Sequence, residues 1–298
     1  MRTRVAIIYI LYNTDLKLLN ESIKSLEESI PDNLDVSFFL YNNSHEDVIH
    51  SINIKEKFEY FHDGQNIGLA KAQNKIIKKN LNNFEYFLTS DQDSIYSPEY
   101  LEIGINFMEM YRHCGCVVPI WRNTMSQNLN FETQIILDNE NLKKINPFDV
   151  EEDYFQVSHA ICSGSIIRGD MFTKIGLFNE DFFIDWIDNE WMWRGHKAGL
   201  NVFCNKNLQI DHQWGEQSLK IMNIEFPNKS DLRTYYTVRN GIALVFQNGL
   251  ESYFKKYLII QLAKHLIYVF FSFNKNKYKN TIKAIFDFKK INLINVKR

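Results

Sequence analysis

The stretch Tyr86-Phe87-Leu88-Thr89-Ser90-Asp91-Gln92-Asp93-Ser94 predicts a strand that runs directly into two carboxylates. Its first three side chains are apolar neighbours, which suits a strand buried inside a sheet. Open α/β sheets bind ligands at the carboxyl ends of such strands, and two carboxylates there suit Mg²⁺ or Mn²⁺ carrying a diphosphate. The alternative is an acidic turn that caps a helix starting near Pro98, because Asp and Ser are favoured in such turns as well.

The segments before this stretch alternate between strand and helix patterns. Short apolar runs occur at 5–11, 36–41 and 58–61. Apolar residues at helical spacing follow the first of these runs, through Leu26, and the third, through Ile76. Strands that alternate with helices predict an α/β fold with a parallel, Rossmann-like sheet, helices on both faces and nucleotide-binding loops at one edge.

From about Cys116 the pattern changes to short strands with longer irregular links. We expect these strands at 117–119, 133–137, 155–167, 202–204 and 208–210, with a helix at 188–198 and a helical chain after Pro227. The sequence therefore predicts one domain at 1–249, divided into halves at about 1–115 and 116–249, followed by a helical extension at 250–298.

Charge is distributed unevenly along the 298 residues. The formal net charge is −2, but residues 250–298 carry 11 Lys or Arg against two acidic residues, a balance of +9, which leaves −11 on the first 249. An acidic body does not suit nucleic acid, whereas the basic tail suits an anionic surface. The tail also has apolar residues at helical spacing from Tyr257 to Phe270. This pattern fits a helix packed on its own domain or an amphipathic helix lying on the cytoplasmic leaflet of a membrane.

The cysteines and the N-terminal residues indicate in which cellular compartment the protein is expected. The chain starts a strand within a few residues, so no signal peptide is expected. The longest apolar stretch, Tyr257–Phe273, is interrupted by Gln261, Lys264 and His265 and falls short of a spanning helix. We expect a cytoplasmic protein, peripheral on the inner face of the plasma membrane if the tail binds lipid. Four cysteines without Cys-x-x-Cys spacing predict buried thiols in a reducing cytosol rather than a disulfide or zinc site: Cys114, Cys116, Cys162 and Cys204.

Eight short motifs occur in the order that is typical of one enzyme family. Over about residues 5–245 the chain resembles the family 2 glycosyltransferases, which adopt the GT-A fold, and it is most similar to bacterial rhamnosyltransferases that use dTDP-L-rhamnose. The motifs are Leu11-Tyr12-Asn13, Asn42-Asn43-Ser44, Asn66-Ile67-Gly68-Leu69-Ala70, Ser90-Asp91-Gln92-Asp93, Cys162-Ser163-Gly164-Ser165, the run from Phe183 to Trp191, His212 with Gly215-Glu216, and Tyr235-Tyr236-Thr237-Val238-Arg239-Asn240.

The resemblance implies a metal site and a general base. Asp93 would bind Mg²⁺ or Mn²⁺ directly, Asp91 would lie beside it at the ribose or a metal-bound water, and His212 would complete the site, unless it is a hydrogen-bonded histidine at a strand end. Asp188 falls where the family places its catalytic base, although it also suits a helix cap. Asp185 is the competing carboxylate, because Ile187 stands where many members have an acidic residue before the base.

The resemblance also assigns donor and acceptor residues. The first half would bind the nucleotide and the second half the acceptor. Asn42 stands where many relatives carry Asp, and ordinary turns are the alternative for the Asn and Gly positions. Arg194 and Arg239 would reach phosphate oxygens or pair with carboxylates instead. The nucleotide-sugar set is Tyr12, Asn13, Asn42, Asn66, Gly68, Asp91, Arg194 and Arg239, and the acceptor set is Ser163, Gly164, Asp185 and Trp186.

The function implied by the resemblance is an inverting, metal-dependent transfer. L-rhamnose would pass from dTDP-L-rhamnose to a hydroxyl of a polyprenyl-diphosphate-linked glycan in O-antigen or capsular polysaccharide synthesis. One alternative is the same fold with a UDP-hexose donor. A protein that binds nucleotide sugar or acts as a membrane scaffold without turnover is a second alternative, and the combination of Asp91, Asp93, Asp188 and His212 argues against it.

Overall fold

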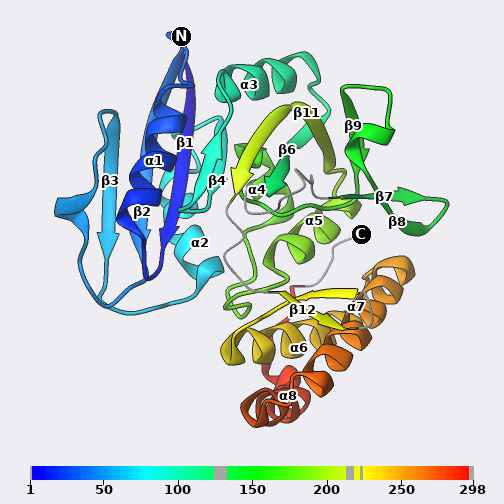
Figure 1. Cartoon of the computed structure of the whole chain (residues 1–298). Coiled ribbons are helices and arrows are strands. Elements are labelled where there is room, and N and C mark those ends of the chain that lie inside the picture. Colours follow the sequence, from blue (N-terminus) through cyan, green and yellow to red (C-terminus); the bar gives the residue numbers. More distant parts are fainter. Residues whose placement is uncertain (1, 124–132, 213–217, 222–223, 295–298) are drawn as a thin grey trace.

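One large mixed sheet forms the centre of the molecule. The computed structural model describes residues 2–123, 133–212, 218–221 and 224–294. In this part of the chain the strands run in the order β3-β2-β1-β4-β10-β6-β11-β5, with β9 paired to β11 outside this row. The sheet, its flanking helices and a group of helices near the C-terminus are seen in Figure 1.

The strands are β1 (Thr3–Leu11), β2 (Leu34–Asn42), β3 (Lys57–His62), β4 (Tyr86–Ser90), β5 (Ser94–Tyr96), β6 (Cys114–Asn123), β7 (Gln134–Asp138), β8 (Asn141–Ile145), β9 (Tyr154–Val157), β10 (Ile166–Arg168), β11 (Asn201–His212), β12 (Ser218–Ile221) and β13 (Ile224–Pro227). The helices are α1 (Leu16–Glu27), α2 (Leu69–Asn80), α3 (Tyr100–Met110), α4 (Gly169–Ile175), α5 (Ile187–Lys197), α6 (Asp231–Val245), α7 (Ser252–Phe271) and α8 (Lys275–Asp287).

Strands β1 to β4 form the parallel part of the sheet, which confirms the prediction from the alternating pattern. β1 pairs in parallel with β2 and with β4, and β2 pairs in parallel with β3. The side chains of Ile7, Phe38 and Leu88 are fully buried, as expected for strands covered on both faces. The polar loops that follow β1, β2 and β4 consequently meet at one edge.

The second half of the sheet is mixed. β10 is antiparallel to both β4 and β6, and it joins the two halves. β11 runs parallel to β6 and antiparallel to β5 and β9. The two short strands expected at 202–204 and 208–210 are one strand, β11, with a register shift between Cys204 and Gln209. All four cysteines are buried and free, in line with the prediction.

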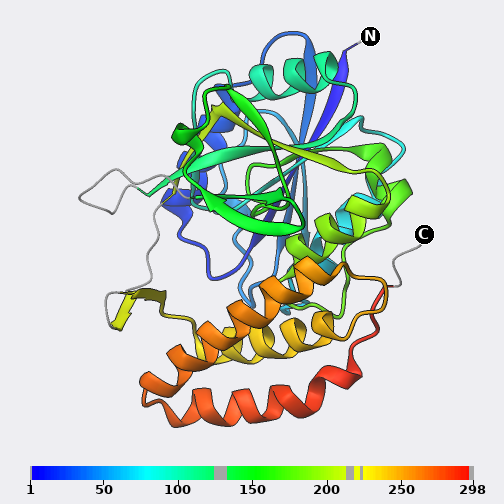
Figure 2. The ribbon, with the colours of Figure 1, turned by 90° about the vertical axis from the view of Figure 1, so that its right-hand side faces the viewer.

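The C-terminal helices pack on each other and on the rest of the chain. Figure 2 shows α6, α7 and α8 beside one another, in yellow, orange and red. Phe254 and Leu258 of α7 are fully buried in the main hydrophobic core, and the Phe254 ring stacks on Trp193 of α5 with centroids 4.8 Å apart. The helical extension is therefore joined to the domain by buried contacts beyond residue 249. Within the described residues, none of the helices is both long and apolar enough to cross a membrane.

Candidate active site

Asp91, Asp93 and His212 lie together at the carboxyl edge of the sheet. The two carboxylates follow β4, and β11 pairs with β5 so that His212 stands opposite Ser94, directly after the carboxylate turn. His212 Nε2 is 3.9 Å from Asp91 Oδ2, and His212 Nδ1 is 3.5 Å from Asp93 Oδ2. One ligand atom from each of the three residues lies within 4.8 Å of the others. The antiparallel return of β11 thus brings together residues that are far apart in the sequence.

The donor set of this triad fits a divalent cation. Two carboxylates and an imidazole suit Mn²⁺ or Mg²⁺ and leave coordination positions for diphosphate oxygens. Burial raises the pKa of the Asp93 carboxyl, the His212 side chain opposes this rise and the Asp91 charge adds to it. Like charges held close together in a partly buried site favour a cation, which would offset their repulsion.

The carboxylate turn is fixed to the loop after β1 by Gln92. Gln92 Oε1 accepts hydrogen bonds from the Tyr12 N–H at 3.2 Å and from the Thr14 hydroxyl at 2.9 Å, while Gln92 Nε2 donates to the Tyr12 carbonyl. The Tyr12 side chain is 51% exposed at this edge. The N–H of Asn13 donates to Ser44 Oγ in the loop after β2. The structure therefore brings the predicted residues Tyr12 and Asn13 next to the carboxylate turn.

Residues 162–165, which we call the strap, link the carboxylate turn to Asp188. The N–H of Cys162 donates to Asp188 Oδ2 at 3.1 Å, and Ser163 Oγ accepts from the N–H of Asp91 at 3.0 Å. The strap is held on β4, because the Thr89 hydroxyl donates to the Cys162 carbonyl and the N–H of Gly164 donates to the Thr89 carbonyl, both at 2.6 Å. Adjacent residues of the strap thus hold Asp188 and Asp91.

The contacts of Ser163 and Gly164 within the strap argue against the acceptor binding predicted for these two residues. Ser163 is 5% exposed, and its hydroxyl is shared between Asp91 and Ser94. Gly164 has φ +77°, and a Cβ there would lie 2.1 Å from Ile210 Cδ1. Both residues shape the site from inside the protein. The Ser163 hydroxyl is already hydrogen-bonded, and the space beside the Gly164 Cα is filled by neighbouring side chains.

Asp188 lies in the first turn of α5 with the properties of a base. Burial raises the pKa of its carboxyl to about 6, against the hydrogen bond from Cys162, and the charges of Asp91 and Asp185 add to the rise. Its Oδ1 is buried and has no hydrogen-bond partner among the described residues. A carboxylate with a pKa near 6 is ionised at neutral pH and still accepts a proton readily.

Asp185 lies among cationic side chains, which lower the pKa of its carboxyl. Its Oδ1 accepts from Arg233 Nη2 at 2.8 Å, and its Oδ2 accepts from the Thr237 hydroxyl at 2.6 Å and lies 3.3 Å from Lys229 Nζ. Burial tends to raise the pKa of the Asp185 carboxyl, but Lys229 and Arg233 outweigh it and hold this pKa at about 2. Asp185 is therefore a weak proton acceptor, and its ion pairs fix the loop before α5 to α6.

Trp186 and Arg239 also fix this loop. Trp186 Nε1 donates to the Thr237 carbonyl at 2.9 Å. The Arg239 guanidinium donates to the Asp181 carbonyl and lies 4.7 Å from the centroid of the Tyr236 ring. The acceptor contact predicted for Trp186 and the phosphate contact predicted for Arg239 stay predictions.

The phosphate contact predicted for Arg194 is wrong. The side chain of Arg194 is 4% exposed, and its guanidinium forms a buried ion pair with Glu190, with Arg194 Nε 2.7 Å from Glu190 Oε1. The other guanidinium nitrogens donate to the carbonyls of Ile175 and Leu177. Because its donors are used inside the protein, Arg194 joins α4 to α5 and has no group left for a phosphate.

The direct nucleotide contact predicted for Asn42 is also wrong. Asn42 is fully buried, its Nδ2 donates to the Glu46 carbonyl and the Tyr60 hydroxyl, and its Oδ1 accepts from the Ser44 N–H. The amide thus shapes the loop after β2.

Gly68 serves close packing, and Asn66 remains exposed. Gly68 has φ +88°, and a Cβ there would lie 2.7 Å from Phe183 Cδ2, so the loop after β3 packs tightly on the loop before α5. Asn66 Oδ1 accepts from the Gly68 N–H. The nucleobase contact predicted for Asn66 stays a prediction, and residues 215–216 of the His212 motif lie outside the described residues.

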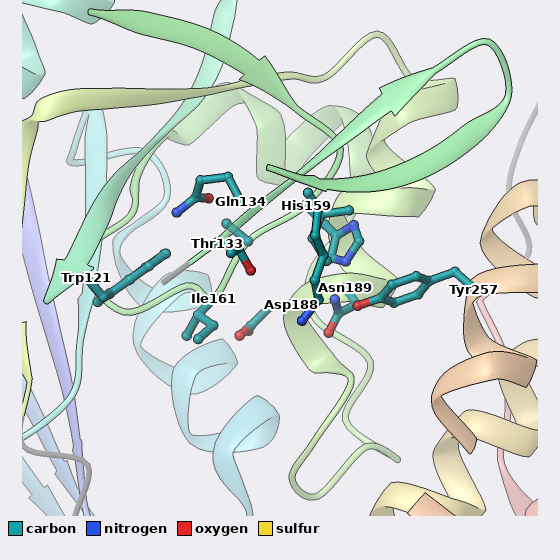
Figure 3. A pocket seen from close by; sticks show the side chains of 11 residues that line it. Trp121, Thr133, Gln134, His159, Ile161, Asp188, Asn189 and Tyr257 are labelled. Carbon is teal, nitrogen blue, oxygen red and sulfur yellow. The ribbon is translucent and has the colours of Figure 1, made fainter. Parts of the chain in front are cut away.

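A cavity of about 210 Å³ lies beside Asp188. Figure 3 shows side chains around it, with Asp188 and Asn189 on one side and Tyr257 reaching in from α7. The sequence analysis did not find the other lining residues, such as Trp121, Gln134 and His159. They come from β6, from β7 and from the segment before the strap, and no local motif connects them.

Comparisons with known proteins agree with this geometry. The family described as glycosyl transferase family 2 matches residues 6–176, more than half of the chain. The dTDP-rhamnosyl transferase RfbF of Shigella flexneri is 28% identical over 254 residues, which are 83% of this chain and 82% of that protein.

Solved structures share the fold at low sequence identity. S. aureus TarS has a TM-score of 0.57 at 15% identity, and GalNAc-T7 with UDP, GalNAc and Mn²⁺ has 0.58 at 11%. These matches cover 97% of this chain but 49% and 58% of the two proteins, so the chain spans about half of their length. The match to TarS 1–349 in complex with UDP-GlcNAc covers 80% of that chain, with a TM-score of 0.58. With a GT-A sheet, a carboxylate turn at its edge and a family match over residues 6–176, the chain belongs to the family 2 glycosyltransferases.

Proposed function

We propose that this chain is an inverting, metal-dependent transferase that moves L-rhamnose from dTDP-L-rhamnose to a hydroxyl of a polyprenyl-diphosphate-linked glycan, in O-antigen or capsular polysaccharide synthesis. The observation that carries the proposal is the strap, which holds the carboxylate of the base-like Asp188 and the backbone of Asp91 in the carboxylate turn through adjacent residues. Glycosyl transfer requires a proton acceptor for the acceptor hydroxyl and a positive charge for the leaving diphosphate, held at a fixed distance from each other.

The chain's own residues account for binding and proton transfer. Asp93, with Asp91 and His212, would hold Mg²⁺ or Mn²⁺, which as a Lewis acid would stabilise the charge of the leaving diphosphate. The acceptor oxygen forms a bond to the anomeric carbon while the bond from that carbon to the diphosphate oxygen breaks. The acceptor proton passes to Asp188 Oδ1, the carboxylate oxygen without a hydrogen-bond partner among the described residues. A single displacement of this kind inverts the anomeric configuration.

The donor part of the proposal is supported by the likeness to RfbF of Shigella flexneri, which is described as a dTDP-rhamnosyl transferase. The test is calorimetric titration of the full chain with dTDP and with UDP, each with Mn²⁺, followed by an assay of nucleoside diphosphate release from dTDP-L-rhamnose and UDP-hexoses. We expect dTDP and dTDP-L-rhamnose to bind more tightly and to be turned over. Tighter binding and turnover of a UDP-hexose would reject the rhamnosyl donor, and binding without any turnover would reject the enzyme.

We also propose that the C-terminal helices dock on an anionic membrane, which would place the enzyme on the inner face of the bacterial plasma membrane. Exposed apolar side chains gather on α7 and α8, including Ile259, Ile267, Phe270, Ile282 and Phe286, which are 48–74% exposed. Exposed lysines share these two helices, namely Lys256, Lys264, Lys275, Lys279 and Lys283. Apolar side chains with lysines between them suit a lipid surface with anionic headgroups.

A further inference from the structure

We propose that the cavity beside Asp188 binds one uncharged sugar ring of the acceptor, and that Trp121, Gln134 and His159 select its hydroxyl pattern. The proposal rests on the proposed function and deepens it, because it names the acceptor residue class and the side chains that recognise it. The cavity volume of about 210 Å³ lies below the ~300–1,000 Å³ that is usual for drug-sized ligands, so it suits a single ring.

Buried polar atoms without a hydrogen-bond partner among the described residues belong to four of the residues that line the cavity. These atoms are Trp121 Nε1, Gln134 Nε2, His159 Nε2 and Asp188 Oδ1. The residues that carry the three nitrogens are 2–3% exposed. Native proteins rarely leave buried polar atoms unpaired, and each such atom costs free energy. Four of them around one cavity indicate a ligand that both donates and accepts hydrogen bonds, as the hydroxyl groups of a sugar do.

The position of His159 is set by the β7–β8 hairpin. The N–H of Ser158 donates to the Ile135 carbonyl at 2.7 Å, and Ile135 forms a bridge with His159. The Ser158 hydroxyl lies 2.6 Å from His159 Nδ1, which leaves Nε2 for a ligand. Burial lowers the pKa of His159 to about 3, so the ring is neutral at physiological pH. His159 is therefore a polar contact without a charge.

The rest of the wall suits the apolar face of a sugar ring. Trp121 and Tyr257 contribute aromatic rings, and Ile161 contributes an aliphatic side chain. The Tyr257 ring meets the His159 ring edge to face with centroids 5.2 Å apart. Apolar and aromatic walls with a few fixed polar groups are the usual design of a small-molecule site.

The charge of the cavity argues against a phosphate or carboxylate ligand. Asp188 contributes a buried carboxylate, and the one cationic side chain among the described lining residues, Lys144, is exposed. The residues of the metal triad, Asp91, Asp93 and His212, are not among those that line the cavity. The cavity thus lies on the acceptor side of the base, and the diphosphate belongs to the triad.

The test uses the full chain with Mn²⁺, dTDP-L-rhamnose and a panel of methyl glycosides at up to 100 mM: methyl L-rhamnoside, methyl D-glucoside, methyl D-galactoside and methyl N-acetyl-D-glucosaminide. We expect at least one glycoside to accelerate dTDP release. Gln134→Leu removes a hydrogen-bond donor and keeps the side-chain shape approximately, whereas Trp121→Phe removes the indole N–H together with part of the ring system. Each should raise the KM for that glycoside about tenfold. The dTDP affinity measured by calorimetry should stay the same. Gln156→Leu, at an exposed position of β9, is the matched control and should change neither quantity.

Different outcomes reject this proposal and the proposed function. If dTDP-L-rhamnose binds and is slowly hydrolysed but no glycoside accelerates dTDP release, the subsite proposal is overturned. It is also overturned if folded Gln134→Leu and Trp121→Phe proteins keep the wild-type KM for the active glycoside. If no nucleotide sugar binds or turns over at all, the proposed function itself fails.

Discussion

The Asp188 carboxylate is unfavourable for the fold in its ionised form, which is the form that the proposed base role needs. An unfolded Asp has a pKa of about 3.9, whereas burial raises the pKa of native Asp188 to about 6. Below pH ~4 the Asp188 carboxyl is protonated in the native and in the unfolded protein, so its ionisation does not change the free energy of unfolding. Between pH ~4 and ~6 the carboxyl is ionised in the unfolded chain but still protonated in the native state, so stability falls across this window. Above pH ~6 the native group is ionised as well, and the loss relative to a neutral side chain is complete.

Asp188→Asn should therefore stabilise the protein and inactivate it. At pH 7.5 we expect the free energy of unfolding to rise by roughly 1–3 kcal/mol, a gain that disappears near pH 4. We also expect kcat to fall by about 10²-fold or more, because the amide accepts no proton. Denaturant unfolding at the two pH values and steady-state kinetics measure both effects.

Asp185→Asn is the comparison for this prediction. It removes the charge that pairs with Lys229 and Arg233, so it should destabilise the fold above pH ~4. This loss has the opposite sign to the Asp188→Asn effect, because the folded pKa of Asp185 lies below its unfolded value. A folded Asp185→Asn protein without activity beside an active Asp188→Asn protein would show that the base is Asp185.

Asp93→Ala should abolish metal-dependent nucleotide binding and leave the fold intact. The residue lies at the edge of the sheet, where it forms a candidate cation site with Asp91 and His212, and its loss would remove a ligand without creating a core cavity. In calorimetry, Mn²⁺ should strengthen dTDP binding to the wild type but not to the variant. The surface change Asp32→Ala is the control. Wild-type activity in saturating chelator would contradict the metal role.

At the scale of elements, the parallel strands are predictable and the mixed half is not. β1, β2 and β4 are short apolar runs followed by polar loops, and this local pattern reflects burial on both faces. The insertion of β10 between β4 and β6 depends on pairing between distant segments, which leaves no local pattern. For the same reason Asp91, Asp93 and Asp188 are found from motifs, whereas Trp121, Gln134 and His159 meet only in the folded chain.

The two wrong donor assignments have one physical origin. Arg194 and Asn42 are polar residues within or beside family motifs, so a ligand contact is a natural expectation. Both side chains are instead used to satisfy buried carbonyls and a buried carboxylate. A sequence shows that a polar group is present but not whether the backbone around it already uses that group.

Arg194→Ala should consequently cost stability and not donor affinity. Removing one partner of the buried Arg194–Glu190 pair leaves an uncompensated carboxylate, which typically costs about 3–5 kcal/mol. The control Lys174→Ala breaks an exposed pair with Asp170 and should cost below about 1 kcal/mol. Chemical denaturation and dTDP calorimetry separate the two effects. A stable Arg194→Ala protein that no longer binds dTDP would restore a phosphate role.

At the scale of the whole molecule, the C-terminal helices have a buried and an exposed side. Phe254 and Leu258 of α7 are fully buried, whereas Ile267 and Phe270 of the same helix are 48% and 62% exposed. Deleting residues 250–298 would uncover core, so loss of solubility after deletion would say nothing about membranes. Substitutions on the exposed side test membrane docking without disturbing the packing.

The double change Phe270→Ser and Phe286→Ser should weaken binding to anionic vesicles at least tenfold, because two apolar side chains no longer enter the headgroup region. Binding of the wild type should also weaken as salt rises, because charge attraction is screened over about 8–10 Å near physiological salt. Vesicle flotation at low and high salt measures both effects. Met110→Ser, at an exposed position of α3, is the control and should bind like the wild type. A wild type that ignores anionic vesicles at low salt would show that the helices are purely structural.

The strap also makes the spacing between its two attachment points, Cys162 and Ser163, critical. Cys162 holds Asp188 through its backbone N–H, which any residue except proline supplies, and Ser163 holds Asp91 through a hydroxyl that threonine also carries. The first attachment therefore depends on the backbone, whereas the second depends on a hydroxyl. Inserting a single residue between them would shift one attachment by about 3.3 Å, the rise per residue of an extended chain. That shift exceeds the tolerance of a hydrogen bond, so an insertion at this point would release either Asp188 or Asp91 from the strap.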